Sequence, residues 1–195
     1  VEASIEVLQN AGANIVPIKV PKLLTWANNL NNLITIAEGS SFHSQWIRSR
    51  PHDYGTNTLR RFLAGAMCPV DKYLHALRLR TALLKSFADT VFSKAHLLHL
   101  PLLPIPVPTI EETDFTKREA GFSKFLNIAG HSTRCINFLG LPAASIPCGF
   151  TKNGLPVSFQ LVGRPFDEVT ILNAANIYQK ETKWHTLLPK CIISQ

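Results

Sequence analysis

Four segments of the chain carry apolar residues at helical spacing. These segments are residues 2–12, 22–49, 57–65 and 70–94. Apolar residues three and four positions apart form one stripe on a helix, and that stripe packs against a core. Over residues 70–94 the predicted stripe comprises Val70, Tyr73, Leu74, Leu77, Leu84, Phe87 and Val91. A fifth helix is predicted over residues 118–137, with a break near Gly130.

Strands are predicted where short apolar runs lie between turn residues. These runs are residues 14–20, 96–100, 144–150 and 155–162. Pro17 lacks a backbone donor, so the first run is expected at a sheet edge or a strand end. Asn153 and Gly154 both tolerate positive φ and predict a hairpin between the last two runs. Residues 101–113 are predicted to form a proline-rich loop.

The residues after the hairpin predict one more helix. Asp167 is suited to cap its first turn, and Glu168 to lie at the positive end of the helix dipole. Its predicted buried face comprises Ile171, Ala174, Ala175 and Tyr178. Helices and strands that alternate along a chain of 195 residues predict the α/β class, with helices packed on a sheet.

The net charge of the chain is +7, from 20 basic and 13 acidic residues. The basic residues are dispersed, and they form no stripe interleaved with aromatic side chains. We therefore expect a solvated basic surface and a missing acidic partner segment, with no nucleic acid as partner. A basic nucleic-acid-binding module is kept as a third hypothesis, which predicts binding that weakens with salt.

Cysteine usage and hydropathy bear on the compartment. The four cysteines form no Cys-x-x-Cys pair and join no histidine cluster, which argues against zinc and favours a cytoplasmic location. The most apolar stretch, residues 96–108, is interrupted by four prolines and is shorter than the ~20 residues of a membrane span. His96 and His99 are interpreted as structural.

The chain starts at Val1 with an acidic segment that lacks both Met and a basic leader, so we expect no signal peptide. A processed chain, a truncation or a numbering convention would each explain a start without Met.

A serine pair beside a histidine is a candidate nucleophile and base. Ser40 and Ser41 precede His43, and Asp53 would complete a Ser-His-Asp arrangement. The pair lies in a predicted helix without the glycines that surround an oxyanion hole. Serine pairs at helix bends are common, so we interpret this pair as structural.

The last third of the chain contains an ordered set of short motifs. They are Asn137-Phe138-Leu139-Gly140-Leu141-Pro142-Ala143, Ser145-Ile146-Pro147-Cys148-Gly149, Gly154-Leu155-Pro156, Gln160 through Glu168, and Trp184-His185. The set extends upstream through further motifs, namely Ala37-Glu38, His43, Trp46, Asp53-Tyr54-Gly55, Arg60-Arg61 through Gly65, and Tyr73 through Arg80. In this order and spacing the motifs resemble the middle and C-terminal regions of the amidase signature family. The resemblance covers nearly the whole chain.

The resemblance implies a fold and a reaction. The fold would be the C-terminal portion of a mixed β-sheet core flanked by helices, with residues 1–195 forming the C-terminal part of a single domain. The reaction would be hydrolysis of a carbon–nitrogen amide bond through a serine acyl-enzyme, without metal or cofactor. The family uses a serine nucleophile, a second serine in a cis peptide bond and a lysine base, beside a glycine-rich signature. With only ten dispersed glycines, this chain is expected to lack that region, which would lie on an N-terminal part.

The resemblance also implies a substrate-pocket wall. In the family the wall is formed mainly by the segment here running from Asn127 to Cys135, which includes Gly130, His131 and Arg134. Arg134 could bind a substrate carboxylate or carbonyl through its guanidinium, or it could face solvent or pair with an acid. Arg61 is a further candidate. Glutamine-using relatives place an aspartate where this chain has Gly130, which argues against a glutaminyl role.

Two functions follow from the resemblance. In the first, the chain completes an amidase whose other part carries the triad, and the assembled enzyme, as a single copy or as a homo-oligomer, acts on a small amide substrate. In the second, the chain is a degenerate, non-catalytic subunit with a binding or regulatory role. Leu100 and Leu102 favour the second, because the family tends to have a Thr-Pro-Thr run at these positions.

Overall fold

The computed structural model describes residues 1–19, 23–114, 125 and 128–187. The helices in these ranges are α1 (Glu2–Asn10), α2 (Leu23–Ser49), α3 (Thr56–Ala66), α4 (Val70–Val91), α6 (His131–Leu139) and α7 (Glu168–Glu181), with 3-10 turns η1 (Pro51–Asp53) and η2 (Trp184–Thr186). The strands are β1 (Leu98–Pro101), β2 (Ala143–Phe150) and β3 (Pro156–Val162). All of the predicted helices that lie in the described ranges form. Part of the segment predicted as helical over 118–137 lies outside them, and α6 begins directly after Gly130.

The described strands form one sheet in the order β1-β3-β2, and both pairings are antiparallel. The central strand β3 alternates its side chains between the two faces of the sheet. Phe159 and Leu161 belong to one apolar core, whereas Val162 belongs to the other. The predicted hairpin is confirmed, and Gly154 adopts a φ of +75°, but Asn153 keeps a negative φ. A bulge near Pro147 interrupts the pairing of β2 with β3.

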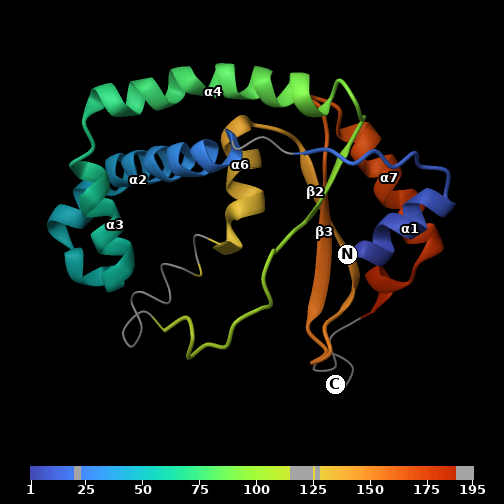
Figure 1. Cartoon of the computed structure of the whole chain (residues 1–195). Coiled ribbons are helices and arrows are strands. Elements are labelled where there is room, and N and C mark those ends of the chain that lie inside the picture. Colours follow the sequence, from blue (N-terminus) through green and yellow to red (C-terminus); the bar gives the residue numbers. More distant parts are fainter. Residues whose placement is uncertain (20–22, 115–124, 126–127, 188–195) are drawn as a thin grey trace.

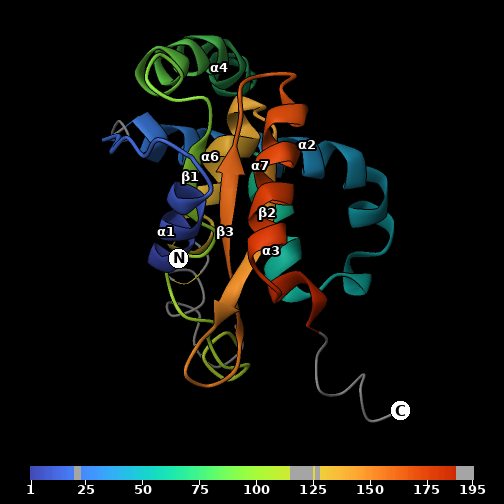
Figure 2. The same ribbon diagram turned by 90° about the vertical axis from the view of Figure 1, so that its right-hand side faces the viewer.

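Helices cover both faces of this sheet. Helices α2, α4 and α6 lie on one side, as Figure 1 shows, and α1 and α7 lie together on the other (Figure 2). The first core is built around Phe87, Val91, Ile136, Leu139 and Val162. The second core is formed by Leu8, Ile146, Phe159, Leu161, Ile171, Ala175 and Tyr178. The predicted α/β class and the predicted buried face of α7 are therefore confirmed.

The strand predicted over residues 14–20 is wrong for residues 14–19, which have no regular secondary structure. Ile15 and Val16 are exposed there. An apolar run becomes a strand only when a neighbouring strand pairs with its backbone. The sheet formed by the described residues offers no such neighbour to this segment.

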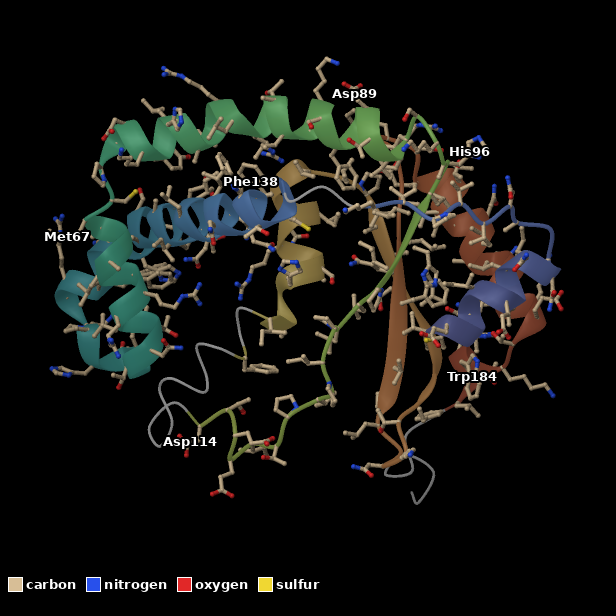
Figure 3. The ribbon with its side chains drawn as sticks, in the orientation of Figure 1. Met67, Asp89, His96, Asp114, Phe138 and Trp184 are labelled. Atoms are coloured by element: carbon tan, nitrogen blue, oxygen red, sulfur yellow. The ribbon has the colours of Figure 1, made fainter. Side chains whose placement is uncertain are left out.

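The buried face of α4 differs from the predicted stripe in its first half. Val70 and Leu74 are 72% and 42% exposed, whereas Ala76 and Leu83 are buried. Phe87 and Val91 are buried as predicted. The first turns of α4 border an open cavity between α2, α3 and α4, so part of the predicted stripe has nothing to pack against. Figure 3 shows the neighbouring Met67, which is 82% exposed, projecting from this end of the molecule.

Two further details of the helices differ from expectation. Helix α2 is not simply amphipathic, because Trp26 and Phe42 are exposed large apolar side chains on it. Asp167 occupies the N-cap position of α7, but its carboxylate accepts a hydrogen bond from the Thr170 hydroxyl at 2.6 Å and none from a backbone N–H.

None of the helices in the described ranges is long and apolar enough to cross a membrane.

Gly65 sets how closely α3 packs against α2. A Cβ built on this residue would lie 2.0 Å from the backbone oxygen of Ile36. Because that atom belongs to the backbone of α2, α3 would have to move. We expect Gly65→Ala to lower the free energy of unfolding by about 2 kcal/mol, measured by chemical denaturation. Gly55→Ala is the matched control, since its Cβ would have no neighbour within 4 Å; an equal loss in both variants would contradict this explanation.

Candidate functional site

Helix α2 packs against both α3 and α6, and polar side chains join it to each of them. Asn28 and Asn32 lie one turn apart on α2. The Asn28 Nδ2 atom lies 3.1 Å from the backbone oxygen of His131 and 3.1 Å from its Nδ1 atom, at the start of α6. Arg61 on α3 donates from Nη2 to the Asn32 Oδ1 atom at 3.4 Å. The junction therefore joins residues more than a hundred positions apart in sequence.

Arg134 lies one turn further along α6 than Gly130 and packs over it. A Cβ built on Gly130 would lie 2.5 Å from the Arg134 Nε atom, so the absence of a side chain there makes room for the guanidinium. Burial lowers the pKa of Arg134, and the positive charge of Arg61 lowers it further. The positive charge of Arg61 therefore influences Arg134 across the junction.

The inner face of α6 fixes the position of this helix. Gln160 on β3 donates from Nε2 to the backbone oxygen of Ser132 at 2.8 Å, and both residues are buried. Cys135, Ile136 and Leu139 pack in the first core. A helix held on its inner side by the sheet presents its first turn, with His131, to α2.

Of the five predicted pocket residues, Arg61, Gly130, His131 and Arg134 lie at this junction, and Asn127 lies outside the described residues. The sequence prediction missed Asn28 and Asn32. A signal for them exists in the sequence. Asparagine is a weak helix former, and four asparagines between positions 28 and 32 are unusual in a segment that is otherwise a good helix.

The serine pair does not form a catalytic arrangement with His43. Ser40 is buried within α2. The His43 ring contacts the Tyr54 hydroxyl through Nδ1 at 2.9 Å and stacks on Phe62 with 4.8 Å between ring centroids. Asp53 forms an exposed ion pair with Arg50 at 3.6 Å. The structural interpretation of these residues agrees with their contacts.

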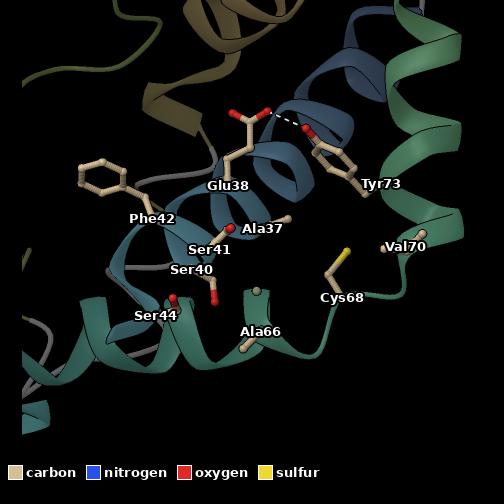
Figure 4. A pocket seen from close by; sticks show the side chains of 11 residues that line it. Ala37, Glu38, Ser40, Ser41, Phe42, Ser44, Ala66, Cys68, Val70 and Tyr73 are labelled. Atoms are coloured by element: carbon tan, nitrogen blue, oxygen red, sulfur yellow. Dashed lines mark hydrogen bonds between the residues drawn. The ribbon is translucent and has the colours of Figure 1, made fainter. Parts of the chain in front are cut away.

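The cavity between α2, α3 and α4 has a volume of about 710 Å³. Its lining is mainly apolar, and its clearest polar feature is the hydrogen bond from the Tyr73 hydroxyl to the Glu38 carboxylate at 2.8 Å (Figure 4). Cys68 and Val70 lie at its rim. A second cavity, of about 500 Å³, is lined by Leu102, the proline-rich loop and the start of β3. No group of three or more potential metal ligands occurs in the part of the chain that the structure describes.

Cys135 provides a probe of the packing beneath the junction. Burial raises the pKa of its thiol to about 11, from an ordinary value of 9.0. The folded state therefore holds the thiol proton more tightly than the unfolded state, and this contribution to stability is complete below pH 9 and lost as the pH rises towards 11. We expect the wild-type chain to lose about 2 kcal/mol more than Cys135→Ala over this interval.

The test of this expectation is denaturant unfolding of both chains at several pH values between 9 and 11. Thiol labelling of the native chain near neutral pH is the control experiment. The half-buried Cys68 and Cys148 should react before the buried Cys135. Equal pH dependence of unfolding in the two chains would contradict a buried, protonated thiol.

Comparisons with known proteins identify the family. The sequence profile of the amidase family matches residues 1–172. The chain is 31% identical over 192 residues to an amidase of Pseudomonas putida, which covers 98% of this chain and 41% of that protein. It is 39% identical over 158 residues to a glutamyl-tRNA(Gln) amidotransferase subunit of Methanosarcina mazei, covering 78% of this chain and 32% of the relative. The chain thus spans about a third to two fifths of the length of these relatives.

Solved structures agree with this assignment. The Kluyveromyces lactis allophanate hydrolase superimposes with a TM-score of 0.78 over 91% of this chain and 28% of its own, at 21% identity, which supports the fold. A structure described as a vestigial protein complex that reveals the origins of an s-triazine catabolic enzyme gives a TM-score of 0.73 at 25% identity, over 92% of this chain and 39% of that chain. The chain belongs to the amidase family.

Proposed function

We propose that this chain is the C-terminal part of an amidase that hydrolyses a carbon–nitrogen bond through a serine acyl-enzyme. In this proposal residues 1–195 form part of a single domain and supply strands of its sheet and one wall of its substrate pocket. The triad lies on an N-terminal part, and the chain alone is inactive. The observation that carries the proposal is the junction on α2, where Arg61 and His131 each contact an asparagine of α2 and the charge of Arg61 acts on Arg134.

The chemistry of this junction favours a substrate with an anionic group or a carbonyl facing Arg134. A guanidinium presents several N–H donors in one plane and matches the two oxygens of a carboxylate. The positive charge of Arg61 also acts on Arg134, so an anionic group bound near both guanidinium groups would be attracted by both. Gly130, His131 and Asn127 complete the proposed substrate-binding set.

Gly130 also bears on the substrate amide. An aspartate at this position, as the resemblance implies for glutamine-using relatives, would place its Cβ against the Arg134 guanidinium. In this chain the guanidinium occupies that space. We therefore propose that the assembled amidase is not a glutaminyl enzyme, although the chain is 39% identical to an amidotransferase subunit.

The exposed apolar surface supports the need for a second part. The exposed large apolar side chains on several elements include Trp26, Phe42, Leu63, Met67 and Phe166. Such a surface is covered when it forms an interface. Intact-mass measurement of the natively purified material tests this idea, since we expect a second chain or a longer chain that contains both parts. A monodisperse, cooperatively folding monomer of 195 residues would contradict the association.

We propose a cytoplasmic location for the assembly. The proposal is compatible with one copy of the assembly or with a homo-oligomer.

A degenerate, non-catalytic subunit is the second candidate, and Leu100 and Leu102 favour it. Leu100 packs against the first core and Leu102 lines the cavity beside the proline-rich loop, so neither provides a hydroxyl there. A fluorophosphonate probe distinguishes the two functions. Covalent labelling of any chain in the natural assembly, together with amide turnover, supports the amidase. Absence of both labelling and turnover supports the degenerate subunit.

A further inference from the structure

The side-chain amide of Asn28 lies between two atoms of His131, and one of them can act only as an acceptor. The Asn28 Nδ2 atom is 3.1 Å from the His131 backbone oxygen. A carbonyl oxygen has no proton to donate, so the amide atom facing it must be the NH₂ group. The same nitrogen lies 3.1 Å from the His131 Nδ1 atom. A donor already faces Nδ1, and Nδ1 must therefore be the ring nitrogen that carries the lone pair.

The opposite orientation of the amide is disfavoured by the same geometry. Turning the Asn28 amide would bring Oδ1 against the His131 carbonyl oxygen, which places two acceptors in contact. The Asn28 Oδ1 atom is buried without a hydrogen-bond partner among the described residues. In the turned orientation the NH₂ group would take that buried position and would lack a partner instead. The turn therefore loses the hydrogen bond to the carbonyl oxygen, sets two acceptors against each other there, and satisfies no buried group.

We infer that Asn28 is a positioning residue that holds the neutral His131 ring in the tautomer with its proton on Nε2. A neutral imidazole carries one proton, so an accepting Nδ1 leaves Nε2 as a donor. Asn28 binds both the backbone and the ring of His131 and so fixes the rotation of the ring as well as its proton. His131 is exposed, which leaves its Nε2–H group available to a ligand.

The fixed tautomer changes what the junction can bind. Arg61 and Arg134 present only donors, and His131 in this tautomer adds a third donor and no acceptor on its free nitrogen. A site of this composition selects a group rich in acceptor oxygens, such as a carboxylate, and disfavours a substrate amine. This step rests on the proposed substrate-binding role of the junction, whereas the tautomer itself does not.

The tautomer is measured directly by nitrogen-15 NMR of histidine-labelled protein in the assembly in which the chain is purified. At about pH 8 we expect the two-bond proton–nitrogen spectrum of His131 to show an unprotonated Nδ1 and a protonated Nε2. His131→Gln removes these signals and so identifies them among the seven histidines. A protonated Nδ1 in the wild-type protein would overturn the inference without any Asn28 variant.

Variants of Asn28 test the cause of the tautomer. Asn28→Asp replaces the donor by an acceptor, so we expect the proton to move to Nδ1. Asn28→Ala removes the donor, and both nitrogen shifts should move towards the averaged values of mixed tautomers. Asn29→Ala, at the exposed neighbouring position of α2, is the matched control and should leave the His131 shifts unchanged. Unchanged shifts in both folded Asn28 variants would show that another contact fixes the proton.

The NMR result on the His131 tautomer can be distinguished from the result of the activity test of the proposed amidase. The spectrum requires no turnover, so an assembly without amidase activity that holds the Nε2–H tautomer would refute the amidase and leave the role of Asn28 intact. In an active assembly, Asn28→Ala should raise KM about fivefold with kcat nearly unchanged, as expected for loss of one oriented hydrogen bond to the substrate.

Discussion

Replacing Phe87 by alanine is expected to lower the free energy of unfolding by about 4 kcal/mol, the loss typical of a large aromatic residue truncated in a close-packed core. Phe87 is fully buried in the first core and packs against the edge of Phe92 with 5.7 Å between ring centroids. The void would lie where α4 meets α2, α6 and the sheet, and the rigid sheet side cannot collapse into it. Chemical denaturation of the purified assembly, followed by circular dichroism, measures the loss.

Val70→Ala is the matched control on the same helix. Val70 belongs to the apolar stripe predicted from the sequence, yet it is exposed at the open end of α4. We expect its truncation to change the free energy of unfolding by less than about 0.5 kcal/mol in the absence of a covering partner. Comparable losses in the two variants would mean that the first turns of α4 are buried in the protein as purified.

This contrast explains which parts of the fold could be predicted from the sequence. The β2–β3 hairpin and α7 depend on local signals, namely the turn at Gly154 and the apolar face around Ile171 and Tyr178, and both were predicted correctly. The strand expected over residues 14–20 and the first turns of the α4 stripe were predicted from apolar pattern alone. A pattern of this kind indicates that a surface can be buried, but a neighbour must be present to bury it.

The candidate site was accessible to sequence reasoning only in part. Arg61 and Arg134 were singled out through the family motifs, and the charge of Arg61 contributes to the lowered pKa of Arg134. Asn28 was not, because its role depends on a contact with His131 across 103 positions of sequence. Spacing rules describe neighbours on one helix, whereas contacts between helices depend on how the helices pack.

Arg134→Ala is expected to lower kcat/KM of the assembled amidase about 100-fold. A charge-assisted hydrogen bond to a partly buried guanidinium contributes about 2–3 kcal/mol when its partner is the substrate. Most of the effect should appear in KM, because a contact to a non-reacting carboxylate stabilises the bound substrate and the transition state alike. Steady-state kinetics on the natural assembly, with a substrate that carries a carboxylate and its neutral counterpart, measures both constants.

Arg134→Lys separates the charge from the geometry of the guanidinium. Lysine keeps the positive charge but cannot present two parallel N–H donors, so we expect it to restore only part of the lost affinity. Arg78→Ala, at an exposed position of α4 away from the junction, is the matched control for the loss of one positive charge and should leave KM unchanged. If Arg134→Ala weakens the neutral substrate as strongly as the charged one, the guanidinium does not recognise an anionic group. Its effect would then arise from displacement of α6 over Gly130, and Gly130→Ala, which crowds the same guanidinium, should reproduce it.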